Sequence, residues 1–354
     1  MDQPYDLEVD RVLSWLRKEK ASKVLVQAPD GIKPYLGPLV SSLENEGVEV
    51  YISGGHAWGG CDIAINEARI LGITHIVHIG HHGPVRVSLS GVKALFIPGK
   101  ANVDVSSVVR KGARLLKRKG DRRVALLTTA QHVHKLDEAA RILEKEGLQV
   151  LIGKSPDPSM PKGLVVGCDL RALDSLRGFD SVMVIAGGLF HGVGAALWTG
   201  RRVILADPYT GSVKEGDDLV RKTLATRLRD ISQALDASEI LMVVSSKPGQ
   251  LLLEGARRIR DCLRRRGKRA YIAVFNEVTR EALENMGRYD AYINTACPRL
   301  AIDDREIFPG PVINLGEVSY LLGRELSTYD PRDALRTFLS SWEISKDQSH
   351  HSSS

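Results

Sequence analysis

The same pattern of hydrophobic and polar positions is repeated three times along the chain. In each copy, a short apolar strand and a polar residue precede an amphipathic helix, a glycine and a second apolar strand. The helices carry apolar residues at intervals of three and four, which gather on one helical face. Each glycine, at positions 47, 147 and 267, stands where the end of a helix favours a left-handed residue. The repeated strands are predicted at 24–27, 48–52, 124–127, 148–152, 240–244 and 270–274.

Further short elements surround each copy of this repeat. A helical pattern precedes every copy, and two more apolar runs follow it. Strands and helices that alternate in this way are typical of parallel sheets with helices on both faces. The preceding helices are predicted at 7–20, 103–119 and 217–235, and the later strands at 75–79, 94–97, 181–185, 203–205, 291–293 and 311–315. The pattern therefore predicts an α/β protein.

The length of the repeat indicates whole domains. Its glycines lie 100 and 120 residues apart, which is too long for the unit of a solenoid. We therefore predict three similar α/β domains with mostly parallel sheets, at residues 1–100, 101–212 and 213–344. Residues 345–354 are predicted to form a flexible tail.

The composition excludes several classes of protein. Of the 354 residues, 43% are hydrophobic and 26% are charged, as in a globular rather than a disordered chain. No run approaches the roughly 18 consecutive apolar residues of a membrane-spanning helix. The acidic residues 1–6 lack the basic region and apolar run of a secretory signal. Because four scattered cysteines fit a reducing compartment best, we expect a cytoplasmic protein with no membrane segment.

The net charge of +6 raises the question of a nucleic-acid partner. Basic residues concentrate at 110–123 and at 257–269, near predicted helix ends, where cations complement the helix dipole. Aromatic residues make up only 5% of the chain, so stacking platforms for bases are scarce. Solvated helix faces explain both clusters, and no direct nucleic-acid binding is expected. A basic nucleic-acid-binding protein stays an alternative.

Common motifs of nucleotide and zinc chemistry are missing from the sequence. It contains no Walker A loop, no dinucleotide-binding glycine motif, no HExxH and no CxxC. Four histidines, His75, His78, His81 and His82, gather near the end of one predicted strand, where α/β sheets place their ligands. The simpler interpretation is a turn whose imidazoles bond the backbone or bind substrate. A metal-dependent hydrolase that uses the His75–His82 cluster is a second alternative.

One cysteine falls in each predicted domain. Cys61, Cys168 and Cys297 are all flanked by glycine, proline or polar residues. Cys262 instead lies beside the apolar face of a predicted helix and is expected to be a small buried side chain. If three similar domains pack about a common axis, their loops meet, and three thiolates there could hold a soft metal centre. A 4Fe-4S cube has four irons, so three thiolates would leave one iron open to a substrate.

Several motifs resemble those of the diphthamide synthase family. The most specific is the sequence NTACPRLAIDD at 294–304, and QAPDGIK at 27–33 is similar to the family's N-terminal motif. The resemblance spans roughly residues 20 to 320. Trp58-Gly59-Gly60 departs from the family, which usually has tyrosine before Gly-Ala-Cys. The remaining motifs, in the family's order, are Cys61-Asp62, His78–His81, Gln131–Leu136 and Gly167–Asp169.

The resemblance implies a single-chain transferase of the archaeal type, acting as a homodimer in the first step of diphthamide synthesis. It implies that Cys61, Cys168 and Cys297 bind a 4Fe-4S cluster at the centre of the three domains, and that S-adenosylmethionine chelates its open iron. An electron from the reduced cluster, supplied by an electron donor, would cleave the bond from the sulfonium to the aminocarboxypropyl carbon. The 3-amino-3-carboxypropyl group would then join a histidine of translation elongation factor two. No catalytic side chain beyond the cluster ligands is implied.

Four polar residues are candidates for holding the methionine carboxylate or amine of S-adenosylmethionine. Gln27, Gln131 and Gln250 occupy equivalent positions after the first strand of each repeat, and His81 follows a later strand. Ligands of parallel sheets bind at these carboxyl ends of the strands. Accurate positioning alone lowers reaction barriers by several kcal/mol. Cocrystals that place the substrate more than one water layer from all four residues would contradict this hypothesis.

Overall fold

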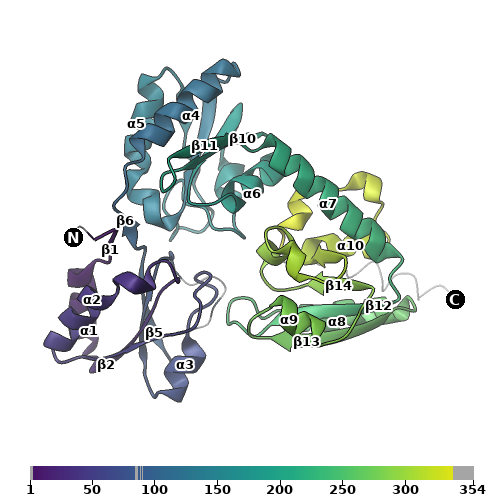
Figure 1. The fold of residues 1–354 in the computed structure, drawn as a ribbon, viewed down its shortest axis with the longest axis horizontal. Coiled ribbons are helices and arrows are strands. Elements are labelled where there is room, and N and C mark those ends of the chain that lie inside the picture. The colour runs from purple at the N-terminus through teal and green to yellow at the C-terminus, as the bar shows by residue number, and fades with distance from the viewer. Residues whose placement is uncertain (1–2, 84–86, 88, 90, 338–354) are drawn as a thin grey trace.

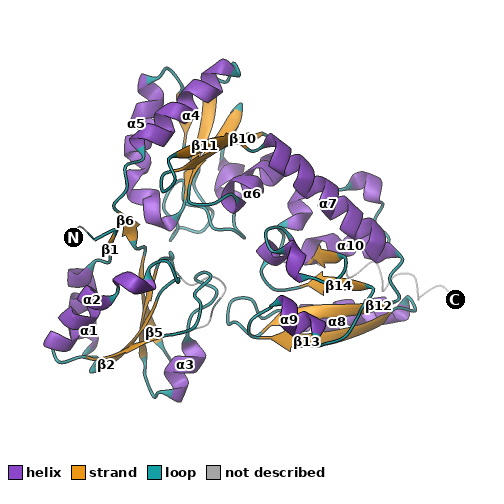
Figure 2. Cartoon of the chain, viewed as in Figure 1, coloured by secondary structure: helices purple, strands orange, loops and turns teal. Residues whose placement is uncertain are grey.

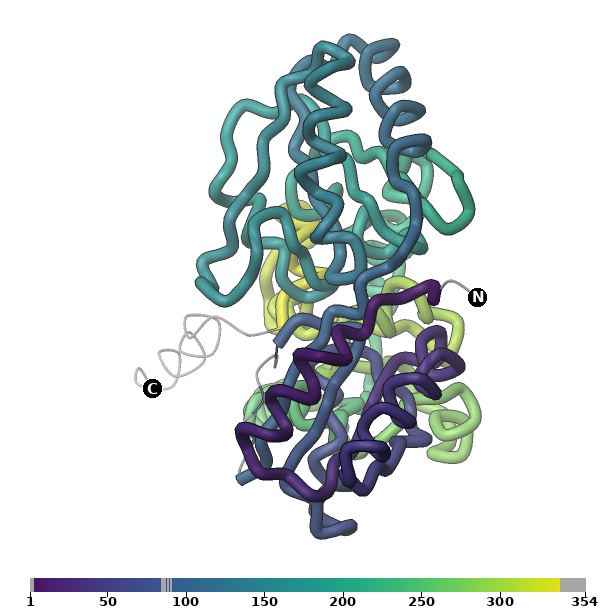
Figure 3. The backbone as a smooth tube through the Cα atoms, turned by 90° about the vertical axis from the view of Figure 1, so that its left-hand side faces the viewer, coloured from purple at the N-terminus to yellow at the C-terminus, as the bar shows by residue number. Residues whose placement is uncertain are grey.

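Three sheets organise the computed structural model, one in each third of the chain. The structure describes residues 3–83, 87, 89 and 91–337. The three units lie at the corners of a triangle in Figure 1, and the turned view in Figure 3 places the middle unit above the other two. Nearly all strand pairs in these sheets are parallel. The prediction of an α/β fold with three similar, mostly parallel sheets is confirmed.

The first unit is a four-stranded parallel sheet in the order β3-β2-β4-β5. Helices α1 and α2 cover one face, where Val12 and Leu39 pack with Val24 and Val26 of β2. Leu25 packs on the other face with α3, because successive strand residues point to opposite sides. The elements are β1 (Tyr5–Asp6), α1 (Val9–Glu19), β2 (Lys23–Gln27), α2 (Gly37–Asn45), β3 (Glu49–Ile52), α3 (Ile65–Ile70), β4 (His75–Ile79), β5 (Lys93–Ile97) and β6 (Lys100–Ala101).

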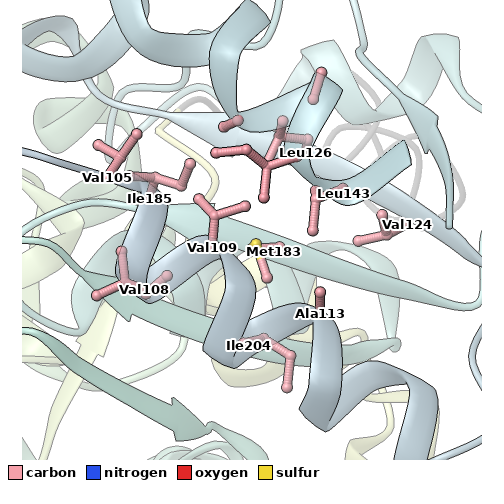
Figure 4. Packing of buried hydrophobic residues seen from close by; sticks show 14 of the residues in the cluster. Val105, Val108, Val109, Ala113, Val124, Leu126, Leu143, Met183, Ile185 and Ile204 are labelled. Carbon is pink, nitrogen blue, oxygen red and sulfur yellow. The ribbon is translucent and has the colours of Figure 1, made fainter. Parts of the chain in front are cut away.

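The middle unit is a five-stranded sheet in the order β11-β10-β9-β7-β8, parallel except for β11. Figure 4 shows its core, in which Val109 of α4 and Met183 of β9 belong to one buried cluster. Gly112 lets α4 approach this sheet closely, because a Cβ there would lie 2.2 Å from Met183 Cε. The elements are α4 (Ser106–Arg118), β7 (Arg123–Thr128), α5 (Leu136–Lys145), β8 (Gln149–Leu151), β9 (Ser181–Ile185), α6 (Phe190–Thr199), β10 (Arg202–Asp207) and β11 (Ser212–Glu215).

The third unit is a parallel sheet in the order β13-β12-β14-β15. Helix α7 leads into it from the middle unit, as Figure 2 shows. Ile231 of α7 and Ile259 of α8 pack with Ile240 of β12 on one face, and Leu283 of α9 packs with Leu241 on the other. The elements are α7 (Asp217–Leu235), β12 (Glu239–Ser245), α8 (Leu253–Arg265), β13 (Arg269–Phe275), α9 (Arg280–Glu284), β14 (Ala291–Asn294), β15 (Val312–Asn314) and α10 (Val318–Leu321).

The three repeat glycines have the backbone conformation that the sequence predicted. Their φ angles are +79° at Gly47, +85° at Gly147 and +78° at Gly267, a left-handed region in which a side chain is strained. Each therefore ends its helix and turns the chain into the next strand.

The limits of the three domains stay a prediction. β11 pairs with β10, so the middle sheet continues past residue 212, and Leu335 packs in the core of the middle unit. β1 pairs with β6 next to the first sheet. The predicted tail at 345–354 lies outside the described residues. Within the described part of the chain, no helix has both the length and the apolar composition needed to cross a membrane.

Candidate metal centre

The three predicted cysteines come together between the three units. Cys61 lies between β3 and α3, Cys168 between β8 and β9, and Cys297 directly after β14. All three line one cavity of about 180 Å³, which we call the thiol cavity. Other residues on its wall are Trp58, Gly80, His81, His82, Gln131, His191 and Arg299.

The cysteine loops are not strictly equivalent in the repeat. Cys61 and Cys168 follow the second strand of their units, whereas Cys297 follows the third. The loops meet nevertheless, because the carboxyl ends of all parallel strands lie at the same edge of a sheet.

Burial makes the thiols of Cys61 and Cys297 hard to ionise without a cation. Burial, with a smaller contribution from the nearby thiols, raises the pKa of Cys61 to about 11 and the pKa of Cys297 to about 12. A bound metal cation stabilises the thiolate with its positive charge, and its binding releases the thiol proton. The donor set therefore fits a thiolate-bound metal centre.

Three thiols at one cavity are a donor set that an iron–sulfur cluster can use. Within the described residues, no three His, Cys, Asp or Glu side chains lie close enough together to hold one metal ion. A 4Fe-4S cube binds each thiolate to a different iron, so its ligands stand further apart than those of one ion. Cys61, Cys168 and Cys297 provide three such ligands around one cavity.

Two asparagines hold the loop that carries Cys297. Asn294 Nδ2 donates to the carbonyl of Cys297 at 2.8 Å and to Asn314 Oδ1 at 2.8 Å. Asn314 Nδ2 in turn donates to the carbonyl of Pro298 at 3.0 Å. Both asparagines are buried, so the loop is fixed by hydrogen bonds that water does not compete for.

Gln27 supports the loop that carries Cys61. Its Nε2 donates to the carbonyl of Asp62 at 2.7 Å, and its Oε1 accepts from the backbone N–H of Ala64 at 2.9 Å. Gln27 is 2% exposed and does not line the thiol cavity, although the repeat placed it beside the other candidates. The structure gives it a supporting role, and its predicted contact with a ligand stays a prediction.

The other three candidates for holding a ligand lie at the cysteines. His81 and Gln131 line the thiol cavity, and Gln131 donates to the carbonyl of Gly80. Gln250 Nε2 lies 3.3 Å from Cys61 Sγ and lines a second cavity of about 190 Å³, which we call the side cavity. Cys61 and Cys297 line both cavities, so they stand between them.

Sequence reasoning missed Arg299. This residue lines both cavities, its guanidinium carbon lies 4.7 Å from the centre of the Phe190 ring, and it pairs with Asp303 at 3.0 Å. A cation at this place can receive an anionic group of a ligand. Its position two residues after Cys297, within the most specific motif, was the available signal.

Lys247 is a second residue that sequence reasoning missed. Its Nζ lies 2.8 Å from Asp62 Oδ2 and 2.5 Å from Glu277 Oε1, so it joins the loop after Cys61 to the third unit. Trp58 Nε1 donates to Glu277 at 3.2 Å and strengthens this junction. Lys247 and Asp62 are 185 positions apart in the chain, so no local pattern could have predicted their contact.

The four neighbouring histidines do not form a metal site. His75 and His78 are three apart on β4 and therefore point to opposite faces of the sheet. His82 Nε2 lies 2.6 Å from the carbonyl of Ser159, whereas His78 and His81 contact each other. The hydrolase alternative thus lacks the ligand group on which it depended.

The comparisons with known proteins agree with the motifs. A family described as putative diphthamide synthesis protein matches residues 28–330. The 2-(3-amino-3-carboxypropyl)histidine synthase of Pyrococcus horikoshii is 34% identical over 92% of this chain and 93% of its own length. Subunit 1 of the synthase of Encephalitozoon cuniculi is 25% identical over 93% of this chain and 92% of its own.

A solved structure has the same fold. The crystal structure of Dph2 from Pyrococcus horikoshii with a 4Fe-4S cluster matches with a TM-score of 0.82 and 33% identity, covering 95% of this chain and 96% of that chain. The predicted resemblance and the predicted class of enzyme, a transferase, are confirmed at the level of the family. The chain belongs to the diphthamide synthesis family.

Proposed function

We propose that this chain transfers the 3-amino-3-carboxypropyl group of S-adenosylmethionine to a histidine of translation elongation factor two, the first step of diphthamide synthesis. The observation that carries the proposal is the meeting of Cys61, Cys168 and Cys297 at one cavity between three units. The names of relatives that match over most of the chain support the reaction.

The three cysteines would hold a 4Fe-4S cluster at the thiol cavity, as the crystal structure of the related Dph2 suggests. When bound, the cluster supplies the electron for breaking the bond between the sulfonium sulfur and the aminocarboxypropyl carbon. The raised pKa values of Cys61 and Cys297 support this assignment, because these thiols gain most from a bound cation.

The protein would bind and orient the substrate from two sides of the cysteines. Arg299 reaches both cavities and is placed to receive the methionine carboxylate. His81 and Gln131, which line the thiol cavity, would contact polar groups of the substrate there, and Gln250 beside Cys61 would do so from the side cavity.

The adenosyl part would lie in the side cavity. Its wall combines the apolar side chains of Val278, Leu300 and Ile307 with polar groups of Ser245 and Asn276. A mostly apolar wall with a few polar groups is typical of sites for small molecules. The homodimer and the electron donor are parts of the proposal that rest on the family resemblance alone, and the cytoplasmic location rests on the cysteine usage.

The first experiment is anaerobic reconstitution with iron and sulfide, followed by visible and EPR spectra after reduction with dithionite. We expect a 4Fe-4S signal that S-adenosylmethionine perturbs, and that Cys61→Ala, Cys168→Ala and Cys297→Ala each weaken. Cys262→Ala is the matched control, because Cys262 is buried on α8 in the core of the third unit. A parent protein that takes up no cluster would contradict the proposal, and its zinc content would then be measured.

The second experiment follows the transferred group. Reduced holoenzyme, S-adenosylmethionine labelled with ¹⁴C in its carboxyl carbon, and elongation factor two should give labelled factor, with the label on a histidine. Factor whose target histidine is replaced by alanine should stay unlabelled. Label that is released as a free product in both reactions would show cleavage without transfer.

A further inference from the structure

The orientation of the Gln27 side-chain amide is fixed by two backbone groups. A carbonyl, that of Asp62, faces its Nε2 at 2.7 Å, and an N–H, that of Ala64, faces its Oε1 at 2.9 Å. A rotated amide would place its oxygen against the carbonyl and its NH₂ against the N–H. The partners therefore decide which atom is the oxygen.

The oxygen of Gln27 determines the tautomer of His78. His78 Nδ1 lies 2.9 Å from Gln27 Oε1, which can only accept a hydrogen bond, so Nδ1 carries a hydrogen. His78 is fully buried, and burial lowers its pKa well below the usual 6.5, so its ring carries a single proton. His78 Nε2 is therefore an acceptor.

The same reasoning continues to His81. Its Nδ1 lies 2.9 Å from His78 Nε2 and must donate. Burial and the nearby His191 lower the pKa of His81 to about 4, so this ring is also neutral. Its Nε2 keeps a lone pair, and none of the described residues donates a hydrogen bond to it.

The backbone holds His81 at the cavity wall. Gly80 has a φ of +89°, and a Cβ there would lie 2.7 Å from Pro29 Cγ, so only glycine allows this turn after β4. Gln131 donates to the carbonyl of Gly80 from the middle unit. His81 therefore lines the thiol cavity on a backbone turn that Gln131 of the middle unit fixes from across the cavity wall.

We propose that Gln27 and His78 keep His81 as a permanent hydrogen-bond acceptor, and that His81 Nε2 binds an N–H donor of a substrate in the thiol cavity. The inference rests on the proposed function, which provides two such donors: the ammonium group of S-adenosylmethionine and the ring N–H of the acceptor histidine. A carboxylate is excluded as the partner of His81, because two acceptors repel each other. Gln27 and His78 act through His81 and are positioning residues.

The tautomers are tested without cluster or substrate. Two-bond ¹⁵N–¹H spectra of cluster-free protein labelled with ¹⁵N-histidine distinguish protonated from bare ring nitrogens. We expect Nδ1 protonated and Nε2 bare in both His78 and His81, with the signals assigned by their loss in His78→Gln and His81→Gln. In Gln27→Met, His81 should show a mixture of tautomers. A protonated Nε2 of His81 in the parent protein would overturn the inference.

Two substitutions of His81 separate its two nitrogens. The amide of His81→Asn reaches the place of Nδ1 and can still donate to His78, but it leaves no acceptor at the place of Nε2. The amide of His81→Gln reaches the place of Nε2 and restores an acceptor there. Because hydrogen bonds to charged groups are the stronger ones, we expect His81→Asn to weaken binding of the donor about tenfold or more. His81→Gln should stay within about threefold of the parent.

The source of the donor follows from two arms of this experiment. Calorimetry on anaerobic holoenzyme measures the affinity for S-adenosylmethionine and for its desamino analogue, and steady-state kinetics gives the KM for elongation factor two. If His81→Asn lowers the affinity for S-adenosylmethionine but not the affinity for its desamino analogue, the ammonium group is the donor. If it raises only the KM for the factor, the acceptor histidine is the donor. Unchanged affinity and KM would overturn the inference.

These outcomes are separate from a failure of the proposed function. A parent holoenzyme that binds no S-adenosylmethionine would contradict the proposed function, whereas the ¹⁵N spectra would still report whether His81 offers a bare Nε2. The tautomer and the reaction are thus tested independently.

Discussion

Two buried polar regions of this protein are built in opposite ways. In the third unit, Arg227 is fully buried, and each of its nitrogens meets an acceptor: Glu317 at 3.1 and 2.5 Å, and the carbonyls of Ala301 at 2.8 Å and Val312 at 2.7 Å. Around the thiol cavity, thiols with raised pKa values and imidazoles with lowered pKa values lie together.

The difference separates scaffold from site. A buried ion pair is stable only when further hydrogen bonds satisfy it, as Tyr329 and the backbone of Asn314 do for Glu317. Polar groups left with unused bonding capacity raise the energy of the empty protein, which a ligand of the right chemistry lowers again. Burial alone does not mark a functional residue, whereas burial without enough partners at the wall of a cavity makes a residue a candidate.

The largest expected loss of stability comes from breaking the buried pair of Arg227 and Glu317, whose polar atoms all have hydrogen-bond partners. Arg227→Met leaves the buried Glu317 carboxylate without its cation, so it should lower the free energy of unfolding locally by about 3–5 kcal/mol. Hydrogen exchange over α7 and α10 measures this loss. Arg258→Met, which removes an exposed ion pair with Glu254, is the control and should cost less than about 0.5 kcal/mol. If Arg227→Met lowers the free energy of unfolding by less than about 1 kcal/mol, the buried pair does not stabilise the third unit, and the contrast with the thiol cavity fails.

The next effect concerns His132, the residue after Gln131 of the thiol cavity. His132 is 1% exposed, neither ring nitrogen has a partner among the described residues, and burial lowers its pKa to about 4. Between its usual pKa of 6.5 and about 4 the unfolded chain binds the proton and the folded chain does not. Stability is therefore lost as the pH falls through this range, by roughly 3 kcal/mol at its lower end.

His132→Phe removes this titration. Thermal unfolding at pH 7.5 and pH 5 should show a smaller acid-induced loss in the variant than in the parent. An equal loss of stability in both proteins would mean that the His132 ring has a hydrogen-bond partner, as the polar groups around Arg227 do.

The smallest loss of stability should come from the junction at which Lys247 joins the loop after Cys61 to the third unit. Lys247→Met leaves Asp62 buried without its cation, and we expect a loss of about 1–3 kcal/mol in stability. Because Asp62 follows Cys61, alkylation of Cys61 in cluster-free protein should also become faster. Arg280→Met, which breaks an exposed pair with Glu284 on α9, is the control. Unchanged alkylation would separate the junction from the cysteine loop.

The sequence predicted the elements with strong patterns best. The helix predicted at 217–235 has those bounds in α7, and the three cysteines meet as the repeat suggested. β1, β6 and β11 were not predicted, because they are short, largely polar strands without an apolar run. A hydrophobic pattern arises where an element buries an apolar face, so strands that bury few apolar side chains cannot be predicted from it.

The wall of the site was predicted less well than its cysteines. Gln27 occupies the position that the repeat assigned, but the loop after Cys61 folds over it and uses its amide. Lys247 and Arg299 gain their roles from partners in other elements, which local sequence does not encode. Contacts between units depend on how the units pack, and a single sequence gives no direct measure of that.

The separation of the cysteines along the chain has a consequence for synthesis. Cys61 and Cys297 are 236 residues apart, so a ribosome that adds about 5–20 residues per second completes the second roughly 10 to 50 seconds after the first. During that interval the first loop has no third unit to cover it, and its thiol is open to oxidants. If all three cysteines hold the centre, as we propose, it can form only on a nearly finished chain. Iron–sulfur loading would then be a late event that reports whether the whole protein has folded.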